Sequence, residues 1–395
     1  MANNATIVIG GGAAGLCAAI SAARQGNSVV LCEKTGQLGK KILASGNGRC
    51  NLLNEDFNES CYNPASRALV KSILSHYGKR EILAFFQELG LSTYSKDGRI
   101  FPVTNQAESV LHVLEMELKR LSVPVVYNFN CTGISSTKNG FLVNSAAGDK
   151  LEGKKVVLTG GGKTYPAFGA DGSAYEIAKQ LGHTIIEPVP AVVPLVIKDN
   201  LCFLLQGQRI TAAARSVIES KEGEWADGEL LFTKYGLSGT CILDISESIS
   251  LALNRQHLAK VYVSIDFVPF MDSQQLKNEL EKRQKSGWPS EDILAGILPS
   301  KLGSALKDIF GKNAQDKAVK LLKDWRFEVS GTRGWNEAEF TSGGINVHDI
   351  KPGTLESKLK PGVYVAGEIL DVNGKRGGYN LGWAWASGLA AGQTQ

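Results

Sequence analysis

The segment Thr6–Gly15 reads TIVIGGGAAG and carries the strongest fold signal of the chain. Its first four residues are apolar or β-branched, as in a buried strand, and its glycines allow a tight turn. A helix of small residues is expected over 16–25 and a second strand over 28–33. The order strand, turn, helix, strand is a βαβ unit, which predicts a parallel sheet.

The glycines of this segment match G-x-G-x-x-G at Gly10, Gly12 and Gly15, and Glu33 ends the next strand. Such a turn lets the backbone approach a pyrophosphate, which the N–H groups of the helix start at Ala13 and Ala14 then face. The acid accepts hydrogen bonds from ribose hydroxyls. The pattern therefore predicts a dinucleotide site in preference to a glycine turn beside a surface acid. FAD, NAD and NADP all remain open, although an acid at position 33 disfavours a 2′-phosphate.

Three further blocks carry chemistry suited to a cofactor. Residues 39–51, GKKILASGNGRCN, combine glycines with cationic and small polar side chains, as in a loop around a phosphate or a polar ring. Residues 156–162 are a strand followed by glycines. Residues 366–371 and 377–381 place an acid after a strand-end glycine and then a helix start, which can face the electron-rich edge of a reduced flavin. A solvated basic loop and a plain strand with its turn are the alternatives for the first two blocks.

The composition bounds the class of protein. The chain has 395 residues, a net charge of +4 and 43% hydrophobic residues, which supports two or three domains and excludes a disordered or collagen-like chain. Its seven cysteines form no C-x-x-C pair and its histidines are isolated, so we expect reduced thiols and no metal. The uncharged stretch 5–23 is rich in glycine, so we expect no membrane span and a cytoplasmic protein.

The pattern of apolar residues changes at about residue 190. Residues 272–325 have helical patterning, with starts at Asp272 and at Pro289-Ser290. A small-residue helix is expected from Tyr379 to Ala391. An inserted antiparallel β module is predicted from β-like runs at 192–197, 208–219, 228–233, 240–245, 260–267 and 326–330.

Residues 10–15, 39–51, 341–345 and 364–388 together resemble the aminoacetone-oxidase-like bacterial FAD flavoproteins. This family includes a bile-acid Δ4-reductase and a ribosomal RNA dihydrouridine synthase, and the resemblance covers essentially the whole chain. It implies an α/β fold in which a discontinuous Rossmann-like FAD-binding domain carries an inserted antiparallel β-barrel-like module and a small helical module. The expected boundaries are 1–190 plus 335–395 for the FAD domain, 191–270 plus about 326–334 for the β module, and 271–325 for the helical module.

The resemblance also implies which residues bind FAD. They are Gly10, Gly12, Ala13, Ala14, Gly15, Glu33, Lys34, Gly39, Lys40, Ser45, Gly46, Gly48, Arg49, Cys50, Asn51, Cys131, Thr159, Gly160, Gly161, Gly367, Glu368, Asp371, Gly378, Tyr379, Asn380 and Leu381. Two positions depart from the family pattern. Lys234 replaces a histidine after Phe-Thr, and Gly382 replaces a glutamine after Tyr-Asn-Leu. Either change can alter the choice of substrate.

The leading functional hypothesis is reduction of an electron-poor C=C bond by hydride from flavin N5. Cys50 and Tyr379 are the candidate proton donors, and Lys234 is a further candidate catalytic residue. Uridine in 23S ribosomal RNA and an enone such as a bile-acid intermediate are the candidate substrates, with NAD(P)H as a transient electron donor. The alternatives are an amine or aminoacetone oxidase that uses O2 and a non-catalytic flavin-containing binding module. The oligomeric state stays open.

Overall fold

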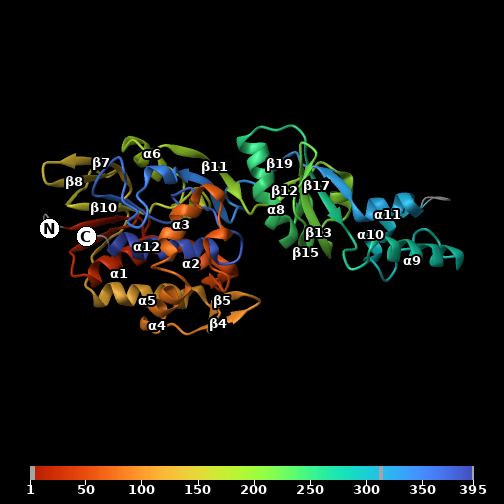
Figure 1. Cartoon of the computed structure of the whole chain (residues 1–395), viewed down its shortest axis with the longest axis horizontal. Coiled ribbons are helices and arrows are strands. Elements are labelled where there is room, and N and C mark those ends of the chain that lie inside the picture. Colours follow the sequence, from red (N-terminus) through yellow and green to blue (C-terminus); the bar gives the residue numbers. More distant parts are fainter. Residues whose placement is uncertain (1–4, 311–314, 394–395) are drawn as a thin grey trace. The chain divides into compact units, whose positions relative to one another are not determined.

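The computed structural model describes residues 5–310 and 315–393 (Figure 1). They form two compact units. The first unit contains the residues up to Pro188 together with those from Phe340 onward, and the second is Val189–Glu339. The chain therefore leaves the first unit, builds the second one and returns.

The first unit is built on a parallel five-stranded sheet in the order β21-β10-β1-β2-β6. Its strands are β1 (Thr6–Ile9), β2 (Val29–Cys32), β6 (Val125–Val126), β10 (Lys155–Leu158) and β21 (Val363–Val365). Every residue of β1 and β2 is buried, which explains why both strands read as continuous apolar runs. The βαβ unit and the parallel sheet predicted from the sequence are confirmed.

Two helices from opposite ends of the chain pack together in this unit, α1 (Ala13–Arg24) and α12 (Tyr379–Gln393). Glycines make the close approach possible, because a Cβ atom at Gly388 would lie 2.3 Å from Ala14 O and one at Gly392 would lie 2.4 Å from Ala18 O. Ser21 Oγ also donates to Leu389 O at 2.9 Å. The small-residue composition of both helices therefore reflects their contact, and it joins the two ends of the chain in one domain.

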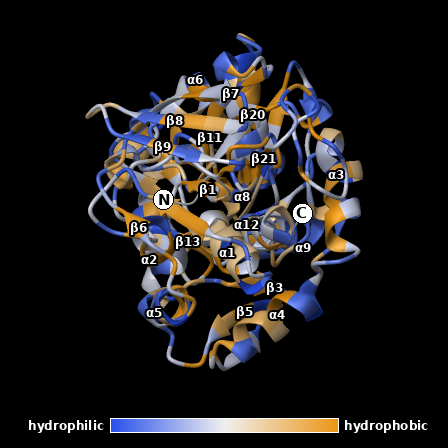
Figure 2. Cartoon of the chain, turned by 90° about the vertical axis from the view of Figure 1, so that its left-hand side faces the viewer, coloured by the Kyte–Doolittle hydropathy of each residue, from blue (hydrophilic) through white to orange (hydrophobic). Residues whose placement is uncertain are grey.

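Further helices and small sheets surround this core. Figure 2 shows both hydrophobic and hydrophilic residues on α5, whose buried side includes Val110, Leu114 and Leu118. The helices are α2 (Lys40–Ala44), α3 (Arg67–Leu74), α4 (Lys79–Glu88), α5 (Ala107–Arg120) and α6 (Ser173–Gln180). The small sheets are β3 (Leu53–Asn54), β5 (Arg99–Pro102) and β4 (Thr93–Lys96); β7 (Cys131–Thr137), β8 (Gly140–Ser145) and β9 (Lys150–Gly153); and β11 (Ile185–Ala191) with β20 (Phe340–Ile345).

The second unit is built on an antiparallel sheet in the order β18-β17-β13-β15-β16-β12-β19, with β14 paired to β13. The strands are β12 (Leu195–Val196), β13 (Arg209–Ile218), β14 (Lys221–Glu222), β15 (Ala226–Thr233), β16 (Gly236–Ser238), β17 (Val261–Asp266), β18 (Trp325–Glu328) and β19 (Gly331–Thr332). The helices are α7 (Asn200–Leu204), α8 (Thr240–Ser250), α9 (Ser273–Lys285), α10 (Ser300–Ala305) and α11 (Gln315–Lys323). The predicted α/β class, Rossmann-like with an inserted antiparallel module and helices, is confirmed.

Two local predictions in this unit were wrong. Residues 240–245, predicted as a strand, are the first part of α8. Ile242, Ile245 and Ile249 are buried at helical spacing, a period that a six-residue run cannot reveal. The predicted helix start at Pro289-Ser290 is also absent from the described residues, which form turns there, and α10 begins at Ser300.

The helices α9, α10 and α11 share one hydrophobic core with the sheet. Leu280, Leu302 and Leu322 are buried in the same cluster as Val263 of β17 and Phe327 of β18. The separation of 271–325 as a module of its own therefore stays a prediction. Within the described part of the chain, no helix is both long and apolar enough to cross a bilayer.

Candidate functional site

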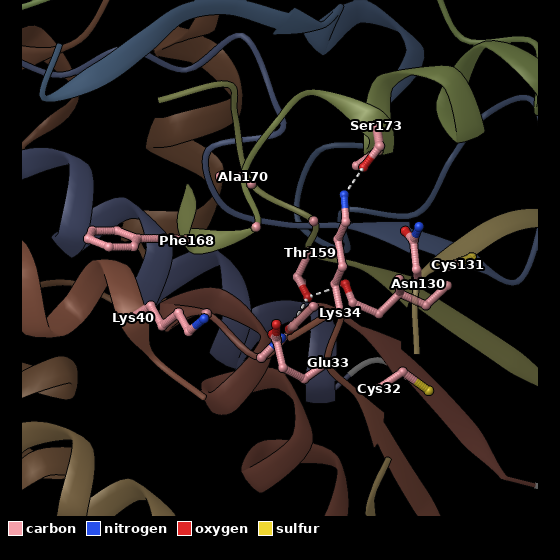
Figure 3. A pocket seen from close by; sticks show the side chains of 18 of the residues that line it. Cys32, Glu33, Lys34, Lys40, Asn130, Cys131, Thr159, Phe168, Ala170 and Ser173 are labelled. Carbon is pink, nitrogen blue, oxygen red and sulfur yellow. Dashed lines mark hydrogen bonds between the residues drawn. The ribbon is translucent and has the colours of Figure 1, made fainter. Parts of the chain in front are cut away.

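A cavity opens at the carboxyl ends of the parallel strands β1, β2 and β10 (Figure 3). β10 and β2 lie on opposite sides of β1, so this is the switch point at which open α/β sheets bind ligands. The cavity has a volume of about 110 Å³. Predicted cofactor residues that line it are Gly10, Gly12, Glu33, Lys34, Gly39, Lys40, Cys131, Thr159, Gly160 and Gly161.

The glycine turn has the geometry of a phosphate cradle. Gly10 has a φ of +106°, and a Cβ atom there would lie 2.5 Å from Thr159 O. A Cβ atom at Gly15 would lie 1.8 Å from Gly10 O, so this glycine is required for the turn itself. At Gly12, in contrast, no described protein atom lies within 4 Å of the Cβ position. The space beside Gly12 and the start of α1 therefore fits an anion such as a pyrophosphate.

Glu33 is buried at the end of β2 and is fixed by backbone donors. Its Oε2 accepts from Gly11 N at 2.8 Å and its Oε1 accepts from Thr35 N at 2.7 Å. A carboxylate has about four acceptor sites, so both oxygens can still accept from ribose hydroxyls. The acid predicted to bind ribose thus lies in the cavity wall with its orientation set.

Three lysines lie beside the cavity, and two of them are paired with carboxylates. Lys34 Nζ lies 2.6 Å from Asp171 Oδ2, and Lys41 Nζ lies 2.5 Å from Glu368 Oε2. Lys40 lines the cavity and has no partner for its ammonium group among the described residues. Lys40 is therefore the cation best suited to a phosphate. Sequence reasoning did not single out Lys41 or Asp171, since nothing local relates either residue to its partner.

The two distant blocks predicted to bind the flavin meet in space. A Cβ atom at Gly378 would lie 2.5 Å from Leu53 C and 3.0 Å from Asn51 Oδ1. Trp385 Nε1 donates to Leu52 O at 3.0 Å. Asn380 closes the turn before α12, since its side chain accepts from Gly374 N at 2.9 Å and donates to Gly374 O at 3.0 Å.

Other predicted residues lie outside the cavity described above. Ser45, Gly46, Gly48 and Arg49 belong to a short turn, and the Arg49 guanidinium stacks on Phe101 at 5.2 Å. The remaining predicted residues belong to α1, to the segment after α2 or to the block before and within α12: Ala13, Ala14, Gly15, Cys50, Asn51, Gly367, Glu368, Asp371, Gly378, Tyr379, Asn380 and Leu381. Lys234 is exposed and belongs to the other unit, so its catalytic role stays a prediction.

Both candidate proton donors hold their protons at neutral pH. Burial raises the pKa of the Cys50 thiol to about 12, against a lowering hydrogen bond with Ser45. Burial also raises the pKa of the Tyr379 phenol to about 12, with a further rise from Cys61 and a lowering contribution from Arg99. Cys50 is fully buried and Tyr379 is 7% exposed, so the phenol is the more accessible of the two.

The chemistry of the site fits FAD. The open space at Gly12, the free Lys40 and the oriented Glu33 suit the adenosine diphosphate half. Near the two flavin blocks, Asn51 Oδ1 and Asn373 Oδ1 are buried without a hydrogen-bond partner among the described residues. A buried acceptor without a donor is costly, and the N–H and hydroxyl groups of a flavin are donors that relieve such a cost. Among the described residues, no group of His, Cys, Asp or Glu side chains is arranged to hold a metal ion.

Comparisons with known proteins identify relatives over the full length. The model of the HI0933-like protein Rossmann domain matches residues 4–394. The chain is 36% identical over 402 residues to the 3-dehydro-bile acid delta(4,6)-reductase of Clostridium scindens, covering 98% of each chain. It is 30% identical over 404 residues to the ribosomal RNA dihydrouridine synthase of Haemophilus influenzae, covering 97% of this chain and 96% of the relative.

Solved flavoenzyme structures share the fold. The chain matches a 3-ketosteroid delta1-dehydrogenase from Sterolibacterium denitrificans with a TM-score of 0.53 at 13% identity, covering 98% of this chain and 99% of the other. It matches the open conformation of a flavocytochrome c3 fumarate reductase with a TM-score of 0.51 at 16% identity, covering 99% and 78%. At these identities the likeness concerns the fold alone.

Proposed function

Because this chain belongs to the HI0933-like family of FAD-dependent oxidoreductases, as its sequence resemblance predicted, we propose that it reduces the electron-poor C=C bond of a cyclic enone. The proposed donor of electrons is NAD(P)H, bound transiently. The relative from Clostridium scindens is named as a reductase of a 3-dehydro-bile acid, which supports an enone of the steroid type.

One feature of the site favours such an apolar substrate, a row of aromatic rings that ends at Tyr379. Phe57 and Tyr62 pack edge to face at 6.3 Å, and Tyr62 and Tyr379 do so at 6.4 Å. The family glutamine is replaced by Gly382, and a Cβ atom there would lie 2.4 Å from the Phe57 ring. The replacement therefore removes a polar group and makes room for the ring, which suits an apolar ring system better than a polyanion.

The residues of the chain have separable tasks in this reduction. Bound FAD would supply the hydride that adds to the β-carbon of the enone. Tyr379, whose phenol has a pKa of about 12, is the proposed acid that protonates the α-carbon. Tyr62 OH donates to Tyr379 O at 2.8 Å and so fixes the backbone from which the phenol projects. Gly12, Lys40 and Glu33 bind and orient the cofactor.

The test separates electron uptake from substrate reduction. Anaerobic holoprotein is reduced with NADH or NADPH and then mixed with a 3-oxo-Δ4 steroid, and the flavin spectrum is followed. We expect reoxidation by the steroid, slowed by about 100-fold or more in Tyr379→Phe with unchanged FAD content. Tyr94→Phe is the matched control, because Tyr94 OH donates to Asn105 Oδ1 in an exposed hydrogen bond and Tyr94 does not line the cavity. Normal rates in both Tyr379→Phe and Cys50→Ala would remove these acids from the mechanism.

A second candidate is reduction of uridine in ribosomal RNA, named for the relatives from Haemophilus influenzae and Escherichia coli. Lys375 favours it, because this exposed cation stands four residues before Tyr379 and has no side-chain partner among the described residues. A deletion strain whose 23S ribosomal RNA lacks dihydrouridine would establish this candidate. Peroxide release on addition of aminoketones in air would instead indicate an oxidase.

A further inference from the structure

Residues 163–172, here called the strap, connect the glycines after β10 to the start of α6. Three residues of the strap, Phe168, Gly169 and Ala170, line the cofactor cavity. Polar contacts near both ends connect the strap to the rest of the first unit, a set of hydrogen bonds at Thr164 and an ion pair at Asp171, and a lysine takes part in each.

The first attachment of the strap is at Thr164, which is fully buried. Its Oγ1 lies 2.7 Å from Lys41 Nζ and 3.2 Å from Glu368 Oε1. The preceding backbone is held as well, because Lys163 N donates to Thr341 Oγ1 at 2.7 Å. This end of the strap is bound to interior groups and is the firmer of the two.

The second attachment is at Asp171, next to α6. Lys34 Nζ lies 2.6 Å from Asp171 Oδ2. It also lies 3.1 Å from Ser173 Oγ, the contact drawn in Figure 3. The side chains of Lys34 and Asp171 are 29% and 41% exposed. Exposed ion pairs contribute little and are screened by salt, so this end is the weaker one.

Between the two attachments the strap is a small stiff piece with flexible joints. Tyr165 and Phe168 stack with their ring centroids 5.4 Å apart. Gly169 and Gly172 have φ values of +98° and +86°, a region that glycine enters without strain. If the second attachment breaks, the segment can turn about these glycines and uncover the cavity.

We propose that the strap is the gate through which FAD leaves the protein, and that Lys34 and Asp171 are positioning residues that hold it closed. Lys34 retains the cofactor through Asp171, in place of the direct contact that the family pattern implies. The proposal concerns retention of the cofactor and is independent of the substrate.

The experiment measures the rate of FAD release from holoprotein. Free FAD is trapped by a phosphodiesterase that converts it to the more fluorescent FMN, so the rise in fluorescence reports release. Asp171→Asn should speed release about two- to fivefold, as expected for loss of one exposed pair. Glu176→Gln is the matched control. Glu176 lies on α6, the helix that follows the strap, where it pairs with Lys179 at 2.8 Å, and it does not line the cavity. Equal rates for Asp171→Asn and wild type would overturn the proposal.

A second set of variants separates retention through Asp171 from direct contact with the cofactor. Lys34→Met should speed release as much as Asp171→Asn does, and the double variant should release FAD no faster than either single variant. Lys34→Arg should release FAD as slowly as the wild type, because arginine keeps the positive charge. Added NaCl should speed release from wild type but much less from Asp171→Asn. A double variant whose effects add would show that Lys34 contacts FAD itself, and the proposal would fail. Equal melting temperatures of the apoproteins would exclude a general loss of stability.

Discussion

Lys41 Nζ lies 2.5 Å from Glu368 Oε2, so an ion pair joins two residues that stand 327 positions apart. The same carboxylate accepts from Thr341 N at 3.0 Å and from the Thr164 hydroxyl at 3.2 Å. The sequence resemblance assigned Glu368 to the cofactor. In the structure its oxygens bind α2, the strap and β20, so its evident task is to hold three segments of the site in register.

Substitution Glu368→Gln tests this task. The amide keeps the shape of the side chain but leaves the partly buried Lys41 ammonium without its counter-charge. We expect the free energy of unfolding of the apoprotein to fall by about 1.5–3 kcal/mol, as for hydrogen bonds to charged groups. Urea denaturation measures it. Glu55→Gln is the control, because the Lys79–Glu55 pair is exposed at 39% and 45% and should contribute less than about 0.5 kcal/mol. Equal effects of the two substitutions would contradict the assigned task.

The parts of the fold that the sequence predicts well are those whose cause is local. A buried strand, a glycine turn and a small-residue helix each show in a few consecutive residues, and Thr6–Gly15 contains all three. The first turns of α8 fail because Thr240 to Ile245 is short and rich in isoleucine and leucine. Its helical period becomes visible only when Ile249 and the buried Ser246 and Ser250 are included.

The parts of the site that the sequence misses are those made by distant partners. Glycines 10, 12 and 15 and Glu33 can be assigned from spacing alone, since one turn and one strand position them. The partners of Lys34 and Lys41 depend on where the strap and the segment after β21 pack, which no local pattern encodes. Sequence reasoning therefore places a cation near the phosphates but cannot say which lysine is free to bind them.

Substitution by alanine should affect two glycines of the turn differently, lowering FAD affinity at Gly12 and preventing normal folding at Gly15. Gly12→Ala fits the protein, because its Cβ would meet no described atom within 4 Å and its φ of −83° suits alanine. The methyl group would occupy the space proposed for the pyrophosphate, so FAD affinity should fall by about tenfold or more, or about 1.4 kcal/mol. Titration of the folded apoprotein with FAD measures this loss.

Gly15→Ala should instead fail to fold normally, because its Cβ would lie 1.8 Å from Gly10 O. Circular dichroism and urea denaturation of both apoproteins make the comparison. Loss of structure in Gly12→Ala, or unchanged FAD affinity in it, would show that the pyrophosphate does not lie against this turn.

Stability should fall in mild acid because of His183. Its Nε2 lies 3.0 Å from Ser357 Oγ, and its Nδ1 lies 3.7 Å from Asp349 Oδ2. Ser357 Oγ also accepts from Leu359 N and Lys360 N, so the buried His183–Ser357 contact anchors this loop. Burial lowers the pKa of His183 below its ordinary 6.5, against an opposing effect of Asp349.

A lowered folded-state pKa means that the unfolded chain binds the proton more tightly. The contribution of neutral His183 is therefore complete above about pH 6.5 and is lost as the pH falls below that value. One proton limits the slope to about 1.4 kcal/mol per pH unit. Urea denaturation at pH 7.5 and 5.5 should show a smaller difference in His183→Gln than in wild type, while the exposed His76→Gln should match wild type. Identical differences in all three proteins would refute this origin of the acid sensitivity.

Restoring the family glutamine at position 382 should fail unless Phe57 is also changed. A Cβ atom at Gly382 would lie 2.4 Å from Phe57 Cε2 and 2.6 Å from Leu53 Cδ1. Gly382→Gln therefore overpacks the site and should lower the free energy of unfolding by about 1–3 kcal/mol. Phe57→Ala opens this space, and the double variant should recover part of the loss, with a coupling energy of about 0.5–3 kcal/mol in urea denaturation. Additive losses would mean that the ring and the glycine do not share one space.

If the coupling is found, the change from glutamine to glycine and the aromatic row beside Tyr379 form a single adaptation. Activity of the refolded double variant on a 3-oxo-Δ4 steroid should then fall relative to wild type, because the row has lost its outer ring.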